Sequence, residues 1–285
     1  MKLRGATSAC HATRHSPLAI LAALLCCIPA HAAPPAITAI YPSGDKLPAN
    51  HLKFYIHFTQ PMLQGVFLQH CTLLDEAGKP VPEPFRETEL WSEDRRRLTL
   101  WFHPGRQKIG VNLNVEFGPV LQPHHRYTLV ISGKWPSEDG TAPGADFKKP
   151  FTAIGRAAGQ LDVSTWKISA PASGTIGPLE IRFPAPLDHA LLLRSLRVVD
   201  SNGTRIVGEV STTLHEQGWQ FTPAQPWKNE THRVLADPVL EDLAGNSLAR
   251  PFEVDLQAPP PKRTPPVPDL PFRPAAEAQR EQGSD

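Results

Sequence analysis

The chain has 285 residues and carries 29 Lys and Arg residues against 28 Asp and Glu residues, so its formal net charge is +1. This balance excludes a general nucleic-acid binder, which needs a basic face to neutralise phosphates. Hydrophobic residues make up 40% of the chain, as in an ordinary globular protein, whereas 32 Pro and 19 Gly interrupt the sequence too often for long helices.

The first 32 residues have the pattern of a secretory signal peptide. Basic residues precede an apolar run over 18–28, and Ala30-His31-Ala32 follows as a cleavage site. The run is shorter than the ~18 apolar residues that span a bilayer. A lipoprotein site at Cys26 or Cys27 is disfavoured because no small residue precedes either cysteine. We therefore expect an exported chain without a transmembrane span, in the periplasm or at the cell surface.

Cys71 is the one cysteine that remains after removal of this leader. The mature chain therefore has no internal disulfide. Cys71 shares a strand face with Leu73, which predicts a buried and inert thiol. The alternative is an intermolecular disulfide.

Residues 52–62 set the pattern of the first half. Leu52, Phe54, Ile56 and Phe58 alternate with other side chains before Pro61 stops the run. This period of two predicts an antiparallel strand with its even-numbered side chains in a core. Further strands are predicted over 37–41, 67–74, 98–103, 127–131 and 150–152.

The same pattern returns in the second half. Leu179 to Leu187 repeats 52–62, and Trp219 to Pro223 repeats 100–104. The stretches 241–246 and 251–254 match the closing turn and final strand of the first copy. Matches that occur in the same order predict a duplicated unit.

The repeat predicts two domains and a tail. The predicted boundaries are 33–155 for the first domain, 156–257 for the second and 258–285 for a Pro-rich, disordered tail. The tail is either a plain spacer or a docking peptide. The first domain also contains an insertion, 106–118, that the second lacks. Added loops are where specific contacts arise, and the alternative is a long hairpin over the sandwich edge.

Short strands with regular turn signals, about seven per copy, are typical of an immunoglobulin-like sandwich. The segments 48–62, 98–100, 127–131 and 241–246 resemble the bacterial Ig-like domain named after the S-layer protein SbsA. The resemblance covers nearly all of the mature chain up to Leu256. It implies an all-β fold of two tandem Ig-like antiparallel β-sandwiches, used as a spacer or interaction module in bacterial surface, secreted or periplasmic proteins. His232 stands in the place of Tyr127, which puts a tyrosine-corner contact in the second copy in doubt.

Motifs for chemistry are few. Neither an HExxH nor a Gly-x-Ser-x-Gly motif occurs. His124 and His125 would suit a transition metal and the Asp- and Asn-rich turns would suit calcium, but ordinary solvated turns also account for them. We therefore expect no cofactor, no metal and no catalysis. The alternative is a periplasmic carbohydrate-active or metal-dependent enzyme.

Candidate partner-binding residues come from two groups. Tyr55, Trp101 and Trp135 fall outside the predicted core register, and aromatic side chains are favoured in recognition surfaces. They face either a partner, a second sheet or the seam between the copies. The insertion adds three further apolar candidates: Ile109, Val111 and Phe117. The partner is predicted to be an envelope protein or a polysaccharide.

Overall fold

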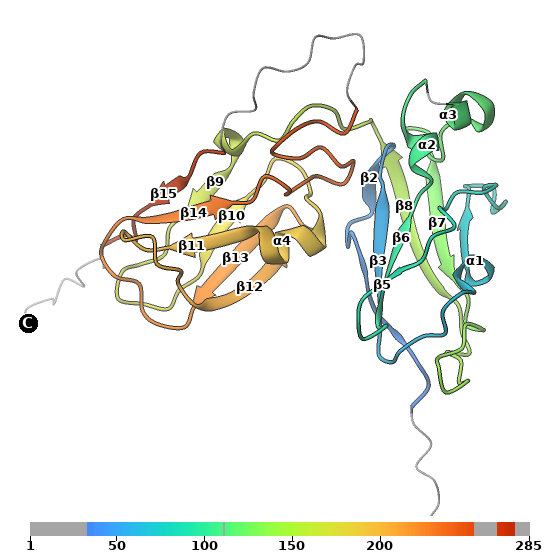
Figure 1. Cartoon of the computed structure of the whole chain (residues 1–285), viewed down its shortest axis with the longest axis horizontal. Coiled ribbons are helices and arrows are strands. Elements are labelled where there is room, and N and C mark those ends of the chain that lie inside the picture. The colour runs from blue at the N-terminus through green and yellow to red at the C-terminus, as the bar shows by residue number, and fades with distance from the viewer. Residues whose placement is uncertain (1–32, 111, 254–266, 277–285) are drawn as a thin grey trace, which may run out of the picture. The chain divides into compact units, whose positions relative to one another are not determined.

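The computed structural model describes residues 33–110, 112–253 and 267–276. From Pro34 onward the chain forms one compact unit, in which β-strands predominate and the helices are short (Figure 1). The signal peptide predicted over 1–32 lies outside the described residues, as does Val111.

Two four-stranded sheets enclose a first hydrophobic core. One sheet has the order β1 (Ile37–Tyr41), β3 (Lys53–Phe58), β6 (Arg97–Trp101) and β5 (Leu90–Trp91), with all neighbours antiparallel. The other has the order β2 (Lys46–Pro48), β8 (Phe147–Ile154), β7 (Arg126–Ile131) and β4 (Cys71–Leu74), and β2 runs parallel to β8. The sheets bury one face each against the other, as in an Ig-like sandwich.

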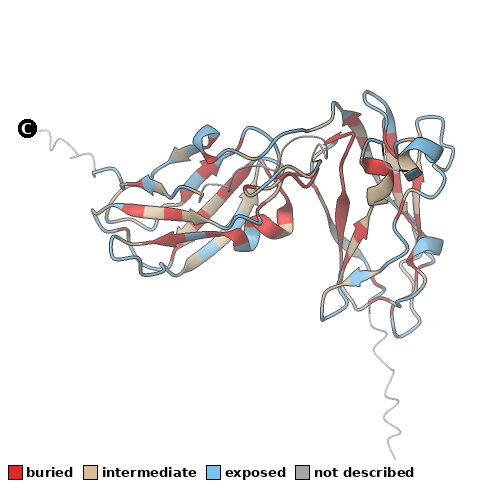
Figure 2. Ribbon diagram, turned by 45° about the horizontal axis from the view of Figure 1, so that its top comes forward, coloured by how far each residue is buried: buried red, intermediate tan, exposed pale blue. Residues whose placement is uncertain are grey.

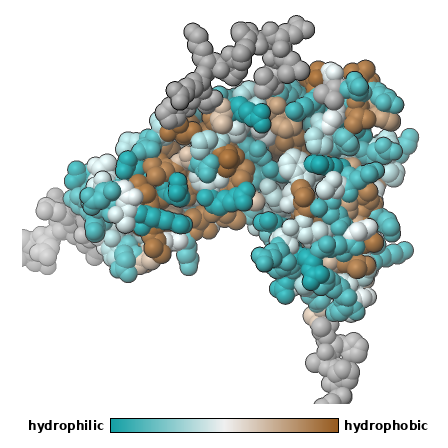
Figure 3. All heavy atoms as spheres, viewed as in Figure 1, coloured by the Kyte–Doolittle hydropathy of each residue, from teal (hydrophilic) through white to brown (hydrophobic). Residues whose placement is uncertain are grey.

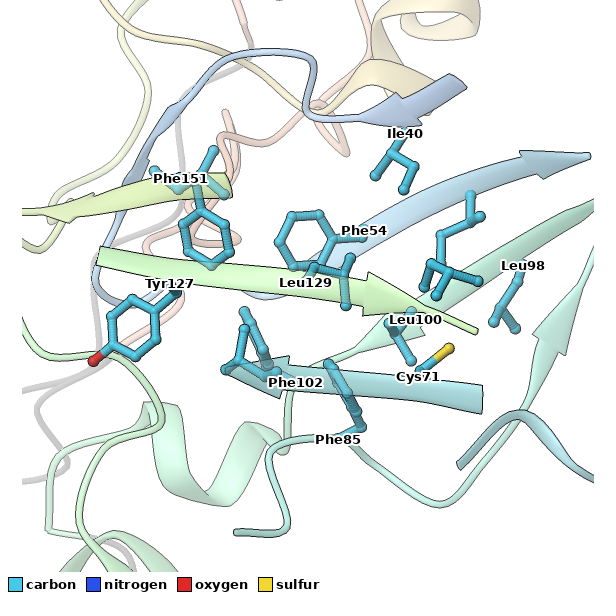
Figure 4. Packing of buried hydrophobic residues seen from close by; sticks show 14 of the residues in the cluster. Ile40, Phe54, Cys71, Phe85, Leu98, Leu100, Phe102, Tyr127, Leu129 and Phe151 are labelled. Atoms are coloured by element: carbon cyan, nitrogen blue, oxygen red, sulfur yellow. The ribbon is translucent and has the colours of Figure 1, made fainter. Parts of the chain in front are cut away.

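Aromatic rings from the two sheets meet in this first core (Figure 4). The ring of Phe54 lies 5.7 Å from that of Phe151 in the opposite sheet and 5.6 Å from that of Phe102. The predicted burial of Leu52, Phe54, Ile56 and Phe58 is confirmed. Cys71 is also buried as predicted, and burial raises the pKa of its thiol.

The second half repeats this strand arrangement around a second core. Its larger sheet has the order β12 (Gly208–Thr213), β13 (Gly218–Pro223), β10 (Leu179–Arg182) and β9 (Lys167–Ser169). Its smaller sheet has the order β11 (Leu196–Val199), β14 (His232–Ala236) and β15 (Leu270–Phe272). A short 3-10 helix, Val163–Thr165, precedes β9. The repeated neighbours confirm the predicted fold of two all-β sandwiches.

The last strand of the second sandwich comes from the predicted tail. Residues 251–253 are not a strand, which corrects the prediction of a final strand over 251–254. Instead β15 pairs antiparallel with β14, and Phe272 is buried in the second core. The prediction of a disordered tail over 258–285 is therefore wrong for 270–272, whereas 258–266 and 277–285 lie outside the described residues.

Two further stretches are wholly or partly helical, one where we predicted a strand and one where a hairpin was the alternative. Helix α1 (Phe67–His70) precedes β4, where we predicted one strand over 67–74. The insertion forms α2 (Pro104–Gln107) and α3 (Asn112–Phe117) rather than a hairpin. Pro104 begins α2, and the ring of His103 accepts a hydrogen bond from the Gly105 N–H at its start.

Candidate functional site

Strand β3 is buried on both of its faces (Figure 2). Its even-numbered side chains enter the first core, as the periodicity requires. Lys53 and Tyr55 point to the other side, yet only 9% and 7% of their surfaces are exposed. Residues of the second sandwich cover them.

Four polar side chains form the contact that covers this face. The Lys53 Nζ lies 3.1 Å from the Asp188 Oδ2 and 2.5 Å from the Glu241 Oε1. The Tyr55 hydroxyl donates to the same Asp188 carboxylate, at 2.8 Å from Oδ2 and 3.0 Å from Oδ1. We call Lys53, Tyr55, Asp188 and Glu241 the seam cluster, because they join β3 of the first sandwich to two loops of the second.

Asp188 also makes a hydrogen bond within its own sandwich. It is the N-cap of helix α4 (His189–Ser195), and its Oδ1 accepts the Leu191 N–H at 2.9 Å. Asp is favoured at this position because its carboxylate pairs with an N–H that has no partner within the helix. The cap therefore holds the carboxylate at the orientation in which Lys53 and Tyr55 meet it.

The environment of the seam cluster changes its titration. Burial alone lowers the pKa of Lys53, but the carboxylates of Asp188 and Glu241 outweigh burial and raise it. Burial raises the pKa of Tyr55, and the adjacent Asp188 raises it further. The Lys53 Nζ also lies 4.8 Å from the centre of the Trp101 ring, a cation–π distance. Lys53 therefore keeps its proton and Tyr55 its hydroxyl hydrogen in this contact.

More contacts flank the seam cluster. The rings of Tyr41 and His189 stack with centroids 3.4 Å apart. Burial lowers the pKa of His189 to about 4. The Ser43 N–H donates to the Glu216 Oε2 at 2.8 Å, and burial raises the pKa of Glu216. The Leu52 N–H donates to the backbone carbonyl of Leu243 at 3.0 Å, and Leu243 packs into the first core.

The loop that carries Glu216 has an uncommon backbone. Leu214, His215 and Glu216 have φ values of 52°, 55° and 64°. Residues with a Cβ rarely adopt this left-handed region, which costs roughly 1–2 kcal/mol per residue. Ser43 contacts the side chains of both His215 and Glu216 at the end of this turn.

A separate apolar surface lies on the insertion. Ile109, Val115 and Phe117 have 69%, 75% and 50% of their surfaces exposed. Hydrophobic side chains gather over the α2 and α3 segment in the space-filling view (Figure 3). We call these three residues the insertion surface.

Arg106 fixes the insertion to the first sandwich. Its side chain is buried, and its guanidinium donates to the carbonyls of Pro82 at 2.5 Å and Gly118 at 3.1 Å. The Asn114 side chain donates to the Arg106 carbonyl at 2.6 Å. The insertion surface therefore stands on an anchored loop.

The structure places the three predicted aromatic candidates in different environments. Trp135 is fully buried and its Nε1 donates to the Leu63 carbonyl at 3.0 Å, so its predicted place in a partner surface is wrong. Tyr55 is likewise buried. It belongs to the seam cluster, and the seam between the copies was one of the alternatives given for it above. Trp101 lies beside Lys53 and is half-buried. Sequence reasoning missed Asp188 and Glu241, since only folding brings them to β3.

Within the described ranges, no group of three or more His, Cys, Asp or Glu side chains is placed to hold a metal ion, and no helix has the length and apolar character to cross a membrane. An open groove of about 590 Å³ crosses β7 and β8, and charged side chains of both signs line it, among them Glu76, Arg126 and Lys148.

Comparisons with known proteins give distant likenesses only. No family model and no curated protein matches the sequence. The native alpha-2-macroglobulin from Escherichia coli, domains MG0-NIE-MG1, is similar at 8% identity over 84% of this chain and 71% of that one, with a TM-score of 0.28. The N-terminal part of the bacterial S-layer protein SbsC is similar at 11% identity over 86% and 45%, with a TM-score of 0.30. The N-terminal four Ig domains of Dscam1 isoform 6.44 give 9% identity over 86% and 52%, with a TM-score of 0.26.

Proposed function

We propose that the chain is a non-catalytic, exported protein of the bacterial cell envelope that acts as a spacer and presents a binding surface. In this proposal residues 1–32 direct export, and two SbsA-type Ig-like domains form the spacer, the first over 33–155 and the second over 156–257 together with β15. Its place of action is the periplasm or the cell surface.

The observation that carries the proposal is the seam cluster. Burying a lysine and two carboxylates requires their desolvation, which contributes little net stability even when the charges pair well. These paired charges instead specify how the two sandwiches are arranged, because Lys53 meets both carboxylates in one arrangement of the sandwiches. A fixed spacing between two modules is what a spacer needs.

The insertion supplies the binding surface in this proposal. Ile109, Val115 and Phe117 are apolar and exposed on a loop that the second sandwich lacks, and Val111 belongs to the same loop. Clustered exposed apolar side chains mark interaction sites. The side chains of Ile109, Val115 and Phe117 present no hydrogen-bonding groups to sugar hydroxyls, so the proposed partner is an envelope protein with an apolar surface rather than a polysaccharide.

The proposal is tested by cross-linking in cells that produce the tagged chain. The test variant replaces Ile109, Val115 and Phe117 with Ser. The control variant replaces Ile176, Val207 and Val239, which are similarly exposed but lie in the second half, with Ser. We expect one protein to be captured by the wild type and the control but lost from the test variant. Equal capture by all three chains would contradict the proposed surface.

A further inference from the structure

We propose that Asn202 is an N-glycosylation site, which receives an oligosaccharide from a lipid-linked donor. This modification goes beyond the spacer role. It rests on one part of the proposed function, export, because Asn-x-Ser/Thr acceptors are modified on surface loops of secreted proteins. Its test needs no binding partner.

Two stretches of the chain have the Asn-x-Ser/Thr pattern of a glycosylation acceptor. They are Asn202-Gly203-Thr204 and Asn229-Glu230-Thr231, and neither has Pro at its middle position, where Pro would exclude it. Both lie in loops of the second sandwich. Because the pattern is short, the surroundings of each asparagine decide whether it can react.

The reactive groups of the first stretch are accessible. It lies in the turn after β11, where Asn202, Gly203 and Thr204 are all exposed. The N–H groups of Asn202 and Thr204 both donate to the Asp200 Oδ1, at 2.9 and 2.8 Å. Neither the Asn202 carboxamide nor the Thr204 hydroxyl makes a hydrogen bond to a described residue. The two side-chain groups that define the acceptor are therefore free to meet an enzyme.

The turn does not need these two side chains for its own geometry. The first sandwich has the same turn after β4, in which the Asp75 Oδ1 accepts the N–H groups of Ala77 and Lys79 at 3.0 and 2.8 Å. Ala77 and Lys79 stand where the second sandwich has Asn202 and Thr204. The carboxylate cap satisfies the same backbone groups in both turns. Turn formation thus explains the aspartate but not the acceptor pattern.

The second stretch is held differently. The Asn229 Oδ1 accepts a hydrogen bond from the Arg273 Nε at 3.1 Å, and the Asn229 backbone carbonyl accepts one from the Arg273 Nη2 at 3.1 Å. Arg273 directly follows β15, so these bonds tie Asn229 to the last strand of the sandwich. The structure therefore singles out Asn202 as the acceptor.

The transfer balances with one co-reactant, an oligosaccharide joined through its first sugar to a lipid diphosphate. The Asn202 Nδ2 bonds to the anomeric carbon of that sugar, and the bond between this carbon and the diphosphate oxygen breaks. The lipid diphosphate leaves with the electron pair. The amide nitrogen gives one proton to a base of the transferring enzyme, an oligosaccharyltransferase of the host.

The modified turn lies away from the seam cluster. Val199, just before the turn, pairs with Arg233 at the start of β14, whereas Glu241 of the seam cluster follows the end of β14. An N-linked oligosaccharide is bulky and solubilising. At this end of the second sandwich it leaves the contacts of Lys53 undisturbed.

The test is mass spectrometry of tryptic peptides from the chain isolated from its natural host. Trypsin separates the two stretches, because Asn202 lies in Val198–Arg205 and Asn229 in Asn229–Arg233. We expect the first peptide to carry the added mass of an oligosaccharide and the second to have its sequence mass. A first peptide at its sequence mass, or with Asn202 merely converted to Asp, would overturn the proposal.

Export is read from the same sample by the absence of residues 1–32. A chain that has lost these residues but carries no sugar on Asn202 would refute the glycosylation site and leave the spacer role intact. A chain that retains them and carries no sugar would refute export as well.

Three variants separate the acceptor from the fold. Asn202→Ala combined with Thr204→Lys copies the turn of the first sandwich, so the chain should keep native circular dichroism and lose the glycan. Thr204→Ser keeps the pattern and should keep the glycan. Ala77→Asn combined with Lys79→Thr moves the pattern to the turn of the first sandwich and should add a second glycan. Loss of the glycan in Thr204→Ser, or no second glycan in the last variant, would contradict an acceptor defined by the pattern in this exposed turn.

Discussion

The ring of His232 stacks on the ring of Phe272, with centroids 5.4 Å apart and an interplanar angle of 24°. Tyr127 and Phe151 stack in the first sandwich with nearly the same geometry, at 5.8 Å and 25°. His232 pairs with Phe272 across β14 and β15, as Tyr127 pairs with Phe151 across β7 and β8. The segment after the Pro-rich stretch therefore completes the second sandwich.

Loss of this late strand should destabilise the second core. Phe272 is buried and its ring lies 5.5 Å from that of Trp227. Phe272→Ala should lower the free energy of unfolding by about 3–5 kcal/mol. Urea unfolding followed by tryptophan fluorescence measures this loss.

Two truncations provide the matched control. A chain that ends at residue 266 lacks β15 and should lose at least as much stability as Phe272→Ala. A chain that ends at residue 276 keeps β15 and should unfold at the wild-type midpoint. Equal midpoints for both truncated chains would show that β15 does not hold the second sandwich.

Removal of one partner from the seam cluster should be severe. Asp188→Ala leaves Glu241 as the one carboxylate beside Lys53 in the seam cluster, leaves the buried Tyr55 hydroxyl without its acceptor and removes the cap of α4. We expect a loss of about 3–5 kcal/mol in the free energy of unfolding. The solvent-exposed pair Arg233–Asp269 is the comparison, because Asp269→Ala should cost about 1 kcal/mol or less. A small effect of Asp188→Ala would contradict the structural role of the cluster.

Stability should fall in mild acid because of His51. His51 is fully buried, and burial, with the nearby charge of Lys53, lowers its pKa to about 3. The unfolded chain binds a proton at this side chain below about pH 6.5, whereas the folded chain does not. Stability is thus complete above about pH 6.5 and decreases as the pH falls toward the folded pKa, by up to about 1.4 kcal/mol per pH unit.

His51→Leu checks this prediction by urea unfolding across the same pH range. The variant keeps an apolar side chain against Phe54 and Phe102, and the Gln107 side chain still donates to the backbone carbonyl of residue 51. We expect a shallower decrease of stability with acid. The same slope in the variant and the wild type would contradict the assignment to His51.

The left-handed turn offers a test of backbone strain. Leu214 has φ of 52° and is half exposed, so Leu214→Gly should relieve strain with little loss of packing. Leu193 is similarly exposed but lies in helix α4, where a change to Gly should cost about 1 kcal/mol. Thermal unfolding should place the Leu214→Gly midpoint above that of Leu193→Gly. The reverse order would argue that the turn is unstrained.

Local patterns were enough to predict the sandwiches. The period of two in β3 correctly placed Phe54 and Ile56 in the first core, because alternation depends only on neighbouring residues. The repeat of that pattern predicted a second sandwich in the second half, which the structure contains. The alternative of a hairpin over 106–118 is wrong, because Asn112–Phe117 of that segment forms helix α3.

Long-range contacts were not predictable from local patterns. Tyr55 and Asp188 are 133 positions apart in sequence, so nothing near Tyr55 indicates that its face is covered. Composition also misled for Leu270 to Phe272, since a Pro-rich context predicts disorder while the pairing partner, β14, lies far back in the chain. Pro271 fits there because β15 is an edge strand.

The central claim, that the seam cluster joins the two sandwiches into one structural unit, is tested most directly by pulsed hydrogen–deuterium exchange with mass spectrometry along a urea series. Peptides from β3 and β10 report the two cores separately. We predict that both become exchangeable at the same urea concentration in the wild type, and that Lys53→Met separates the two transitions. Separate transitions in the wild type that Lys53→Met leaves unchanged would contradict the claim.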